Sequence, residues 1–366
     1  MVYDGHLTQP TIEGTKMYKR DGRYYIFSPA GGVSTGWQTV LRSDNPFGPY
    51  EERIVMAWAK GTINGPHQGA WVEGPDGGDW FIHFQDKGPY GRIVHLQPMR
   101  WLPDGWPLIG EDPDGDGVGQ PVSSWKSPTG ARQEKEGRVL SGPYGIPLDW
   151  QYPAVPSPYW HHALPDGGIR LYSVESPSEG SLWNCPNILS RKFPAENFTV
   201  EARITFHPSP VLSGEEAGFV VTGNDYGAIR IADNGENASL FFVLCEGASK
   251  GEKERTTQIA SIDYKVQTPV YPYASGNVPA VKYPPLRDAT LWVRLSVRCR
   301  AVEGDSPQAL CRLYYSTNGR KYLPAGEEFK ASPELWIGAK YGFYCKRTYS
   351  RNDSGWLDVE DVQVNY

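Results

Sequence analysis

An internal repeat of about 55 residues constrains the first part of this 366-residue chain more than any other feature. A short strand, a glycine-containing turn and an aromatic-rich strand are predicted in residues 17–32, and again in residues 71–87. Tyr25 and Phe81 occupy equivalent places, 56 positions apart. A unit of this length with about four strands is typical of one blade of a β-propeller.

The composition also favours strands over helices. The chain contains 41 glycines and 32 prolines, and 13% of its residues are aromatic, which suits short strands joined by many turns. A chain of 366 residues is too long for one ordinary core, so we expect two domains. The first, a partial β-propeller, is predicted over residues 1–145.

The pattern of apolar and polar residues changes near residue 181. Apolar and polar residues alternate along "FTVEARITF" (198–206) and "LWVRLSVR" (291–298), and "STNGRKY" (316–322) carries an Asn-Gly hairpin turn. Such alternation predicts an antiparallel β-sandwich over residues 181–366. Residues 146–180 are rich in proline, which predicts a connector without a central strand or long helix. We expect four aromatic residues to pack this connector on the first domain: Trp150, Tyr152, Tyr159 and Trp160.

Charge and hydropathy exclude several classes of partner. The net charge of −6 gives no reason to expect a nucleic acid, and no apolar run approaches the ~20 residues that cross a bilayer. No basic segment followed by an apolar stretch stands after Met1, so we expect no signal peptide, and the location stays open between cytoplasmic and secreted. The five cysteines form no C-x-x-C pair, so a zinc site is not expected and reduced, packed thiols are.

Glu13 is the first candidate for chemistry, because it stands beside an apolar residue and a glycine in Ile12-Glu13-Gly14. An apolar environment raises the pKa of a carboxyl group, and a raised pKa is what a general acid needs near neutral pH. The alternative is a surface glutamate at the start of a strand. The residues alone leave both readings open.

Four ordered blocks resemble glycoside hydrolase family 43. They are "PTIEGTKMYKRDGRYYIFSPAGG", "GWQTVLRSDNPFGPYEE", "NGPHQGAWVEGPDGGDWFIHFQD" and "YGRIVHLQPMRWLPDGWPLIG". The resemblance covers residues 1–150, and "FPAENFTVEARITF" resembles the concanavalin-like sandwich that follows many β-xylosidases and α-L-arabinofuranosidases of this family. It implies an all-β chain of a partial, about three-bladed, β-propeller followed by a sandwich. It also implies a plant cell-wall oligosaccharide, of xylan or arabinoxylan type, as partner.

The resemblance assigns roles to six residues of the propeller. Glu13 matches the general acid of an inverting enzyme, and Arg92 matches an arginine that contacts the substrate, against the alternative of a solvated strand arginine. His67 matches a central histidine that holds calcium or water in some members, against the alternative of a core histidine. The residues expected to line the pocket are Trp37, Gly31 and Gly32, with Trp37 either a sugar platform or a core aromatic.

An inverting glycosidase needs a base as well as an acid. In the family a base and a pKa-tuning aspartate precede the acid by a long stretch, yet twelve residues precede Glu13, and the surroundings of Asp4 match neither aspartate. The resemblance thus implies an N-terminally truncated propeller, with Asp86, Asp4 or a second polypeptide as the source of a base. Open blade faces would then pair two chains as a homodimer. The alternative function is a non-catalytic glycan-binding protein or a truncated remnant.

No cofactor is required for this chemistry, and a structural calcium ion is an open option. Residues 112–117, "DPDGDG", match the start of a calcium loop, but Ser123 stands where an EF-hand has glutamate, so an acidic turn is the first expectation. Asp358 and Asp361 are a second candidate calcium pair, by analogy. Three aromatic residues of the sandwich are candidate surface platforms: Trp336, Tyr341 and Tyr344. The choice between xyloside and arabinofuranoside stays open.

Overall fold

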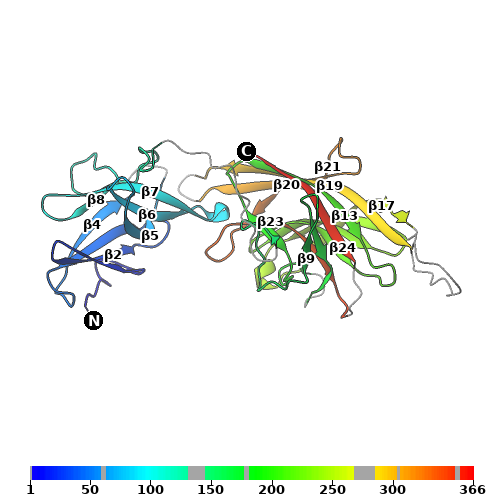
Figure 1. Cartoon of the computed structure of the whole chain (residues 1–366), viewed down its shortest axis with the longest axis horizontal. Coiled ribbons are helices and arrows are strands. Elements are labelled where there is room, and N and C mark those ends of the chain that lie inside the picture. Colours follow the sequence, from blue (N-terminus) through cyan, green and yellow to red (C-terminus); the bar gives the residue numbers. More distant parts are fainter. Residues whose placement is uncertain are drawn as a thin grey trace. The chain divides into compact units, whose positions relative to one another are not determined.

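The structure is a computed structural model, and it describes residues 2–58, 63–130, 145–176, 181–267, 285–302, 306–350 and 355–366. The chain divides into two compact units, one of Met1–Lys87 with Arg92–Gly137 and one of Gly88–Gly91 with Arg138–Tyr366. Both are built almost entirely of strands (Figure 1). No helix among the described residues is long and apolar enough to cross a membrane.

The first unit holds two four-stranded antiparallel sheets, and in each the strands pair in chain order. The hairpin predicted after Glu13 is the β1–β2 pair, with Tyr18 opposite Tyr25. The strands of the first sheet are β1 (Lys16–Arg20), β2 (Arg23–Ala30), β3 (Trp37–Ser43) and β4 (Glu51–Ala57). Those of the second sheet are β5 (His67–Glu73), β6 (Asp79–Asp86), β7 (Arg92–Trp101) and β8 (Pro107–Ile109).

The repeat found in the sequence corresponds to these two sheets. Tyr25 lies on β2 and Phe81 on β6, the second strand of each sheet, and Trp37 and Arg92 each begin the third. Both aromatic side chains are buried in a core that also contains Phe27, whose ring centroid lies 6.0 Å from that of Phe81. The blade-like, all-β architecture is confirmed. The described residues contain two such sheets, where we expected about three.

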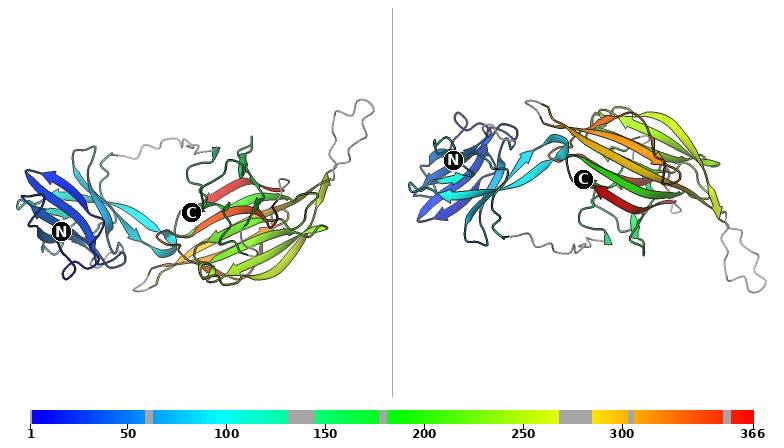
Figure 2. Two further views of the ribbon diagram at one scale, coloured as in Figure 1. Left: turned by 90° about the horizontal axis from the view of Figure 1, so that it is seen from below. Right: turned by 90° about the horizontal axis from the view of Figure 1, so that it is seen from above.

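The second unit packs a nine-stranded sheet against a seven-stranded one. Figure 2 shows the two sheets from opposite sides. The first contains β9 (His161–Ala163), β10 (Ile169–Tyr172), β13 (Phe198–His207), β18 (Lys265–Gln267), β19 (Leu286–Arg300), β20 (Gln308–Ser316), β21 (Leu323–Pro324), β22 (Phe329–Ala331) and β24 (Trp356–Asn365). The second contains β11 (Val174–Glu175), β12 (Leu189–Lys192), β14 (Glu216–Thr222), β15 (Tyr226–Asp233), β16 (Asn237–Cys245), β17 (Arg255–Asp263) and β23 (Lys340–Arg347).

The alternation along residues 198–206 is confirmed. Phe198, Val200 and Ile204 on β13 point into the core between the sheets, and the intervening residues are partly exposed. The described part of this unit also includes the short 3-10 turns η1 (Gly88–Tyr90) and η3 (Ala248–Lys250). Tyr90 of η1 joins the same core, and its hydroxyl group donates a hydrogen bond of 3.0 Å to the carbonyl oxygen of Glu196. All ladders of the two sheets are antiparallel except the short β11–β23 pair.

The predicted connector at 146–180 belongs to the sandwich over its described part. Strand β10 pairs with β24, β9 pairs with β10, and β11 pairs with β23. Trp150 packs near Phe343 of the sandwich core, so the expected packing of this residue on the first domain is wrong. Tyr159 is exposed on the second unit. The prolines of this segment argued against strands, yet β9 and β10 are short enough to lie between successive prolines. Residues 177–180 lie outside the described part.

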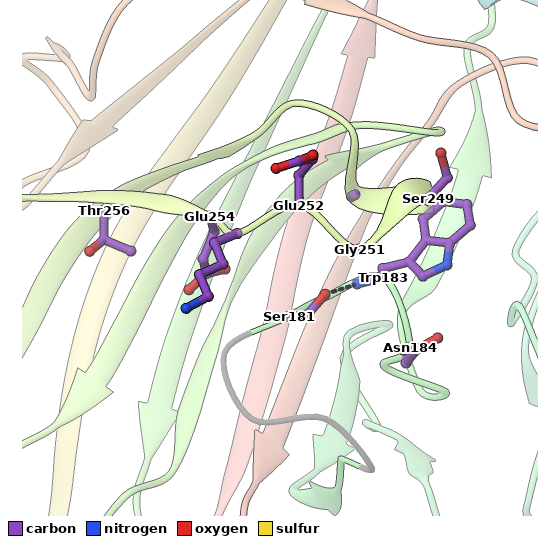
Figure 3. Close-up of a pocket in the computed structure, with 10 residues that line it drawn as sticks. Ser181, Trp183, Asn184, Ser249, Gly251, Glu252, Glu254 and Thr256 are labelled. Carbon is purple, nitrogen blue, oxygen red and sulfur yellow. Dashed lines mark hydrogen bonds between the residues drawn. The ribbon is translucent and has the colours of Figure 1, made fainter.

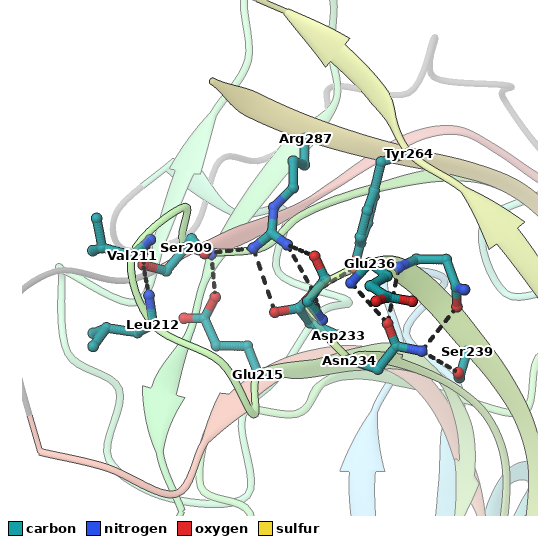
Figure 4. Close-up of polar contacts among 12 residues, drawn as sticks. Ser209, Val211, Leu212, Glu215, Asp233, Asn234, Glu236, Ser239, Tyr264 and Arg287 are labelled. Carbon is teal, nitrogen blue, oxygen red and sulfur yellow. Dashed lines mark hydrogen bonds and ion pairs between the residues drawn. The ribbon is translucent and has the colours of Figure 1, made fainter. Parts of the chain in front are cut away.

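A buried polar network holds one end of the sandwich together (Figure 4). The side chain of Asp233 has no exposed surface, and Arg287 lies 3.4 Å from its Oδ1 atom while Tyr264 donates a hydrogen bond of 2.7 Å to the same atom. Arg287 also donates to the carbonyl oxygens of Ser209 and Gly235. The buried negative charge is therefore paired and its oxygens are hydrogen-bonded, as burial in a low dielectric requires.

All five cysteines are free thiols, as expected from their spacing. Four of them are buried: Cys185, Cys245, Cys311 and Cys345. Burial raises the pKa of Cys345 well above its ordinary value and raises that of Cys185 to about 12. Cys299 is the partly exposed one.

Candidate active site

Glu13 lies on a segment that runs beside the end of β2. The backbone N–H group of Glu13 donates a hydrogen bond of 3.2 Å to the carbonyl oxygen of Pro29, and that of Gly31 donates one of 2.8 Å to Pro10. These two bonds fix the backbone of the segment before the β1–β2 hairpin begins. The carboxyl group is therefore presented from a defined position in the first unit.

The carboxylate of Glu13 is bonded to a buried histidine. Nε2 of His67, the first residue of β5, lies 2.7 Å from Oε1 of Glu13. The side chain of His67 is 1% exposed and that of Glu13 is 55% exposed. The histidine is thus the fixed partner, and the carboxylate stands at the surface above it. Both readings of Glu13 capture part of this arrangement, because the residue is solvent-accessible and also held by a specific partner.

Arg92, the first residue of β7, lies close enough to Glu13 to act on it electrostatically. Its guanidinium carbon lies 4.5 Å from the centroid of the Phe84 ring, and its Nε atom is 3.8 Å from Oδ2 of Asp86. Within the described residues this Nε atom has no hydrogen-bond partner. The structure therefore brings together Glu13, His67 and Arg92, and the Nε atom of this arginine is buried beside Asp86.

The electrostatics of Glu13 differ from the expectation. The hydrogen bond from His67 is the largest influence and lowers the pKa of Glu13; burial opposes it, and Gln68 and Arg92 lower the pKa further. The predicted raised pKa is wrong for this chain, because the side chain is more than half exposed and its partners favour the charged form. A carboxyl group in this state accepts hydrogen bonds readily and gives up a proton more easily than an ordinary glutamic acid.

Gly31, Gly32 and Trp37 build the wall behind the Glu13 segment. The indole Nε1–H of Trp37 donates a hydrogen bond of 2.7 Å to Oε1 of Gln9. Gly31 has φ +79°, and a Cβ atom there would lie 2.5 Å from Cζ3 of the same indole ring. The indole ring of Trp37 is therefore held by Gln9 and lies against Gly31. Its role as a sugar platform stays a prediction.

Gln9 and Gln68 were not singled out from the sequence. Gln9 also accepts a hydrogen bond of 2.6 Å from the hydroxyl group of Thr39, which fixes the start of the segment that carries Glu13. Gln68 adopts φ 51°, a left-handed conformation that is rare for a residue with a side chain. The position of Gln68 directly after His67 in "GPHQGAW" was the signal that could have drawn attention to it.

The described residues contain no group of three or more His, Cys, Asp or Glu side chains that could hold a metal ion. His67 uses Nε2 on Glu13, and no hydrogen-bond partner among the described residues faces its buried Nδ1 atom. Calcium prefers several oxygen ligands, so the neighbourhood of His67 does not by itself fit that ion. In the acidic turn, Asp112 accepts hydrogen bonds from the backbone N–H groups of Gly115 and Gly117.

Asp358 and Asp361, the second candidate calcium pair, are engaged by arginine side chains, and two of the three proposed platforms are buried. Asp358 accepts two hydrogen bonds from Arg170, of 2.7 and 2.9 Å, and Asp361 accepts one from Arg203. Tyr341 and Tyr344 are buried, so their prediction as surface platforms is wrong. They lie on β23, a strand buried on both faces, which has no alternation to reveal it. Trp336 is exposed, as expected.

Comparison with protein families now gives the class. The model described as "Glycosyl hydrolases family 43" matches residues 2–107, and "Beta xylosidase C-terminal Concanavalin A-like domain" matches residues 144–365. The second match covers well over half of the chain. This chain belongs to glycosyl hydrolase family 43, in the group whose propeller-type domain is followed by that C-terminal domain.

Curated relatives carry names consistent with this class. A "Putative beta-xylosidase" of Xylanibacter ruminicola is 32% identical over 95% of this chain and 56% of its own length. A "Beta-xylosidase" of Formosa agariphila is 26% identical over 97% of this chain and 59% of its own length. A "Non-reducing end alpha-L-arabinofuranosidase" of Bacteroides ovatus is 28% identical over 62% of this chain and 45% of its own length. The chain thus spans little more than half of the length of the first two of these relatives.

Solved structures agree in fold. A glycoside hydrolase of family 43 engineered for endo-xylanase and exo-arabinofuranosidase activity aligns with a TM-score of 0.73 and 24% identity, over 100% of this chain and 66% of that one. A xylan β-1,4-xylosidase of Bacillus halodurans aligns with a TM-score of 0.69 and 17% identity, over 97% of this chain and 65% of that one. At these identities the likeness shows the shared fold.

Proposed function

We propose that this chain acts in the hydrolysis of xylan- or arabinoxylan-derived glycosides, as a β-xylosidase or α-L-arabinofuranosidase of the inverting type. Glu13 is the proton donor to the leaving glycosidic oxygen, and Arg92 anchors the sugar. The observation that carries the proposal is the cluster of Glu13, His67 and Arg92 from three separate segments of the propeller-type unit. The names of the relatives support the substrate class.

The two side chains suit these roles. A carboxyl group that is half exposed yet held at 2.7 Å by a buried histidine can meet a substrate in a defined orientation. The guanidinium group of Arg92 is held over Phe84, and its fork of donors suits recognition of adjacent sugar hydroxyl groups. The lowered pKa of Glu13 means that the protonated form needed for donation becomes abundant only in acid solution.

The catalytic base is the second requirement. Asp86 is the candidate we favour within this chain, because its Oδ2 atom lies 3.8 Å from Nε of Arg92. Asp4 pairs with the exposed His6 at 2.6 Å and belongs to a different local contact. A second polypeptide is the third source. In each case the base takes a proton from water as the water oxygen attacks the anomeric carbon.

The test compares two kinds of leaving group. The phenolate leaving group of an aryl xyloside needs little help from an acid. In xylobiose and arabinoxylan oligosaccharides the leaving group is a sugar, which would depart as a poor alkoxide unless it receives a proton. We expect Glu13→Gln to lower kcat by about 10²–10⁴-fold on xylobiose and much less on the aryl glycosides. Asp86→Asn should lower both rates. Equal rates for wild type and Glu13→Gln on xylobiose would remove Glu13 from the acid role.

The alternative function is binding of such glycans without cleavage. The lowered pKa of Glu13 favours this reading, because a group that is ionised at neutral pH is a poor proton donor there. Saturable binding of xylohexaose that depends on Arg92, without release of xylose or arabinose over the range pH 4–7, would establish it.

We further propose that two chains associate through the second blade-like sheet. Ile82 on β6 lies opposite Leu96 on β7, and Val94 lies further along the same strand. All three side chains are exposed, Val94 by 69%. A row of exposed apolar residues on a sheet face favours association. Light scattering should give twice the single-chain mass of 40.8 kDa, and Val94→Asp with Leu96→Asp should restore the single mass. A single-chain mass for the wild type would contradict the proposal.

A further inference from the structure

The seven-stranded sheet of the second unit is buried on both faces. Phe219 on β14 and Ile229 on β15 point into the main core, while their neighbours Val220 and Ala228 belong to a separate small core on the opposite face. This follows from the period of two along a strand. Leu182 and Cys185 cover the small core, each about 1% exposed. The outer face of the sheet therefore carries a second, smaller hydrophobic core.

An open pocket of about 620 Å³ lies beside this small core. Figure 3 shows its lining, which includes one large aromatic ring and several polar side chains. The residues that line it include Trp183, Asn184, Ser249, Glu252, Glu254 and Thr256. Pockets of this size that combine an apolar surface with a few placed polar groups are typical of small-ligand sites.

Trp183 stands on a fixed backbone with its ring open to solvent. Its backbone N–H group donates a hydrogen bond of 3.2 Å to the hydroxyl group of Ser181, and its neighbour Leu182 donates one of 3.3 Å to the hydroxyl group of Tyr226. The side chain of Trp183 is nevertheless exposed. An aromatic ring presented from a fixed backbone has few rotatable bonds to order when a ligand packs on its face.

Glu254 places a nearly buried carboxylate at the same pocket. Its side chain is 10% exposed, and it accepts hydrogen bonds of 2.8 Å from Tyr226 and 2.7 Å from Arg230. These partners fix its orientation and neutralise its charge. A carboxylate offers about four lone-pair positions, so further positions remain for hydroxyl groups of a ligand.

The opposite wall is a rigid turn around η3. The backbone N–H group of Gly247 donates a hydrogen bond of 2.6 Å to Asp225, and that of Ser249 donates one of 2.9 Å to the carbonyl oxygen of Asn224. Gly247 has φ 79°, the left-handed conformation that glycine adopts at little cost. The hydroxyl group of Ser249 is thereby held at the pocket.

The chemistry of the lining selects a neutral, hydroxyl-rich ligand. Glu252, Lys253 and Glu254 bring both signs of charge to the pocket, so no uniform potential favours an anion or a cation. An aromatic face packs against the C–H face of a sugar ring, while amide, hydroxyl and carboxylate groups bond its hydroxyl groups. We propose that the Trp183 pocket is a non-catalytic binding site for a neutral oligosaccharide. The choice of a xylan-type chain as its probe rests on the proposed function; the pocket itself does not.

Isothermal titration calorimetry of the full chain with xylohexaose and cellohexaose tests the proposal. The chain carries Glu13→Gln in every arm to prevent turnover. Trp183→Ala should weaken binding about tenfold or more, and Trp183→Phe should keep part of it. Tyr159→Ala is the matched control, because that aromatic ring is also exposed on the second unit and does not line the pocket. Its affinity should equal that of the parent.

Two further measurements separate this proposal from the proposed function. Arg92→Ala should leave the Trp183-dependent binding intact. Trp183→Ala made in the wild-type chain, without Glu13→Gln, should hydrolyse aryl glycosides at the wild-type rate. Loss of hydrolysis in all forms would end the proposed function and leave the pocket standing. No saturable binding of either hexaose by the parent, or equal affinity for Trp183→Ala and parent, would overturn the pocket proposal.

Discussion

Nε2 of His67 lies 2.7 Å from Oε1 of Glu13 and joins two residues that stand 54 positions apart in the chain. The histidine is almost fully buried at the start of β5, and the glutamate precedes the first strand. Because a hydrogen bond to a carboxylate favours its charged form, this contact sets the direction of the Glu13 pKa shift.

Removing the His67 contact should raise the pKa of Glu13. In His67→Leu the carboxyl group loses its strongest partner, so its pKa should return toward the ordinary value of about 4.3. A larger fraction of Glu13 is then protonated at a given pH, so the alkaline limb of any hydrolysis, where the proton donor is lost, should move to higher pH. Carboxyl ¹³C NMR titration measures the pKa, with Glu13→Gln identifying the resonance. His67→Gln retains an N–H donor and should shift the pKa less; an unchanged pKa in His67→Leu contradicts the assignment.

Gly31 and Gly32 offer a matched pair for the wall behind Glu13. Both have positive φ, +79° and +84°, but a Cβ atom at Gly31 would meet the Trp37 ring, whereas one at Gly32 meets nothing within 4 Å. Gly32→Ala should lower the free energy of unfolding by about 1 kcal/mol through backbone strain. Gly31→Ala should cost about 1–3 kcal/mol more through overpacking. Urea unfolding followed by fluorescence gives both values, and equal losses would mean that the indole moves aside freely.

Arg287 should be essential to the stability of the sandwich because it balances the buried Asp233. Arg287→Leu leaves that carboxylate without its cation, and we expect a loss of about 3–5 kcal/mol in the free energy of unfolding. Asp233→Asn combined with Arg287→Leu removes the buried charge and should lose less than Arg287→Leu alone. Denaturant unfolding of the wild type, the two single variants and the double variant measures this coupling. A double variant as unstable as the sum of the two single variants would refute the coupling.

Tyr90 should stabilise the second unit although it lies between two strands of the first in sequence. Its ring lies 6.3 Å from that of Phe193, and its hydroxyl group bonds Glu196. Tyr90→Phe should cost about 1 kcal/mol, the value of one hydrogen bond, and Tyr90→Ala about 3–5 kcal/mol. Thermal unfolding monitored on the sandwich gives the difference. Full stability of Tyr90→Ala would exclude residues 88–91 from this core.

Local patterns predicted much of the fold. The repeat placed Tyr25 and Phe81 on equivalent strands, and strict alternation identified β13, because each feature depends on neighbours along one strand. The strands β9 and β10 escaped notice because they are three and four residues long and flanked by prolines. Tyr344 was misplaced because the sheet that carries it is covered on both faces, and residues near 182 that cover it are distant in sequence.

The candidate site was predicted in its members but not in its electrostatics. Resemblance supplied Glu13, His67 and Arg92, and the structure brings these three together. The hydrogen bond between Glu13 and His67 joins two blade-like sheets, and no periodicity within either strand encodes it. The exposure of Glu13 follows from how its segment meets β2, so the sequence could not show that the His67 contact would outweigh desolvation.

The reactivity of the buried thiols reports how often the two sheets of the sandwich separate. Cys311 lies on β20 and Cys345 on β23, one in each sheet, and neither can meet a thiol reagent while the sheets stay packed. Modification in native buffer would then proceed no faster than the sheets separate. Cys299 would react first and mark the starting point, so the mass of the modified chain over time would count openings without any added label.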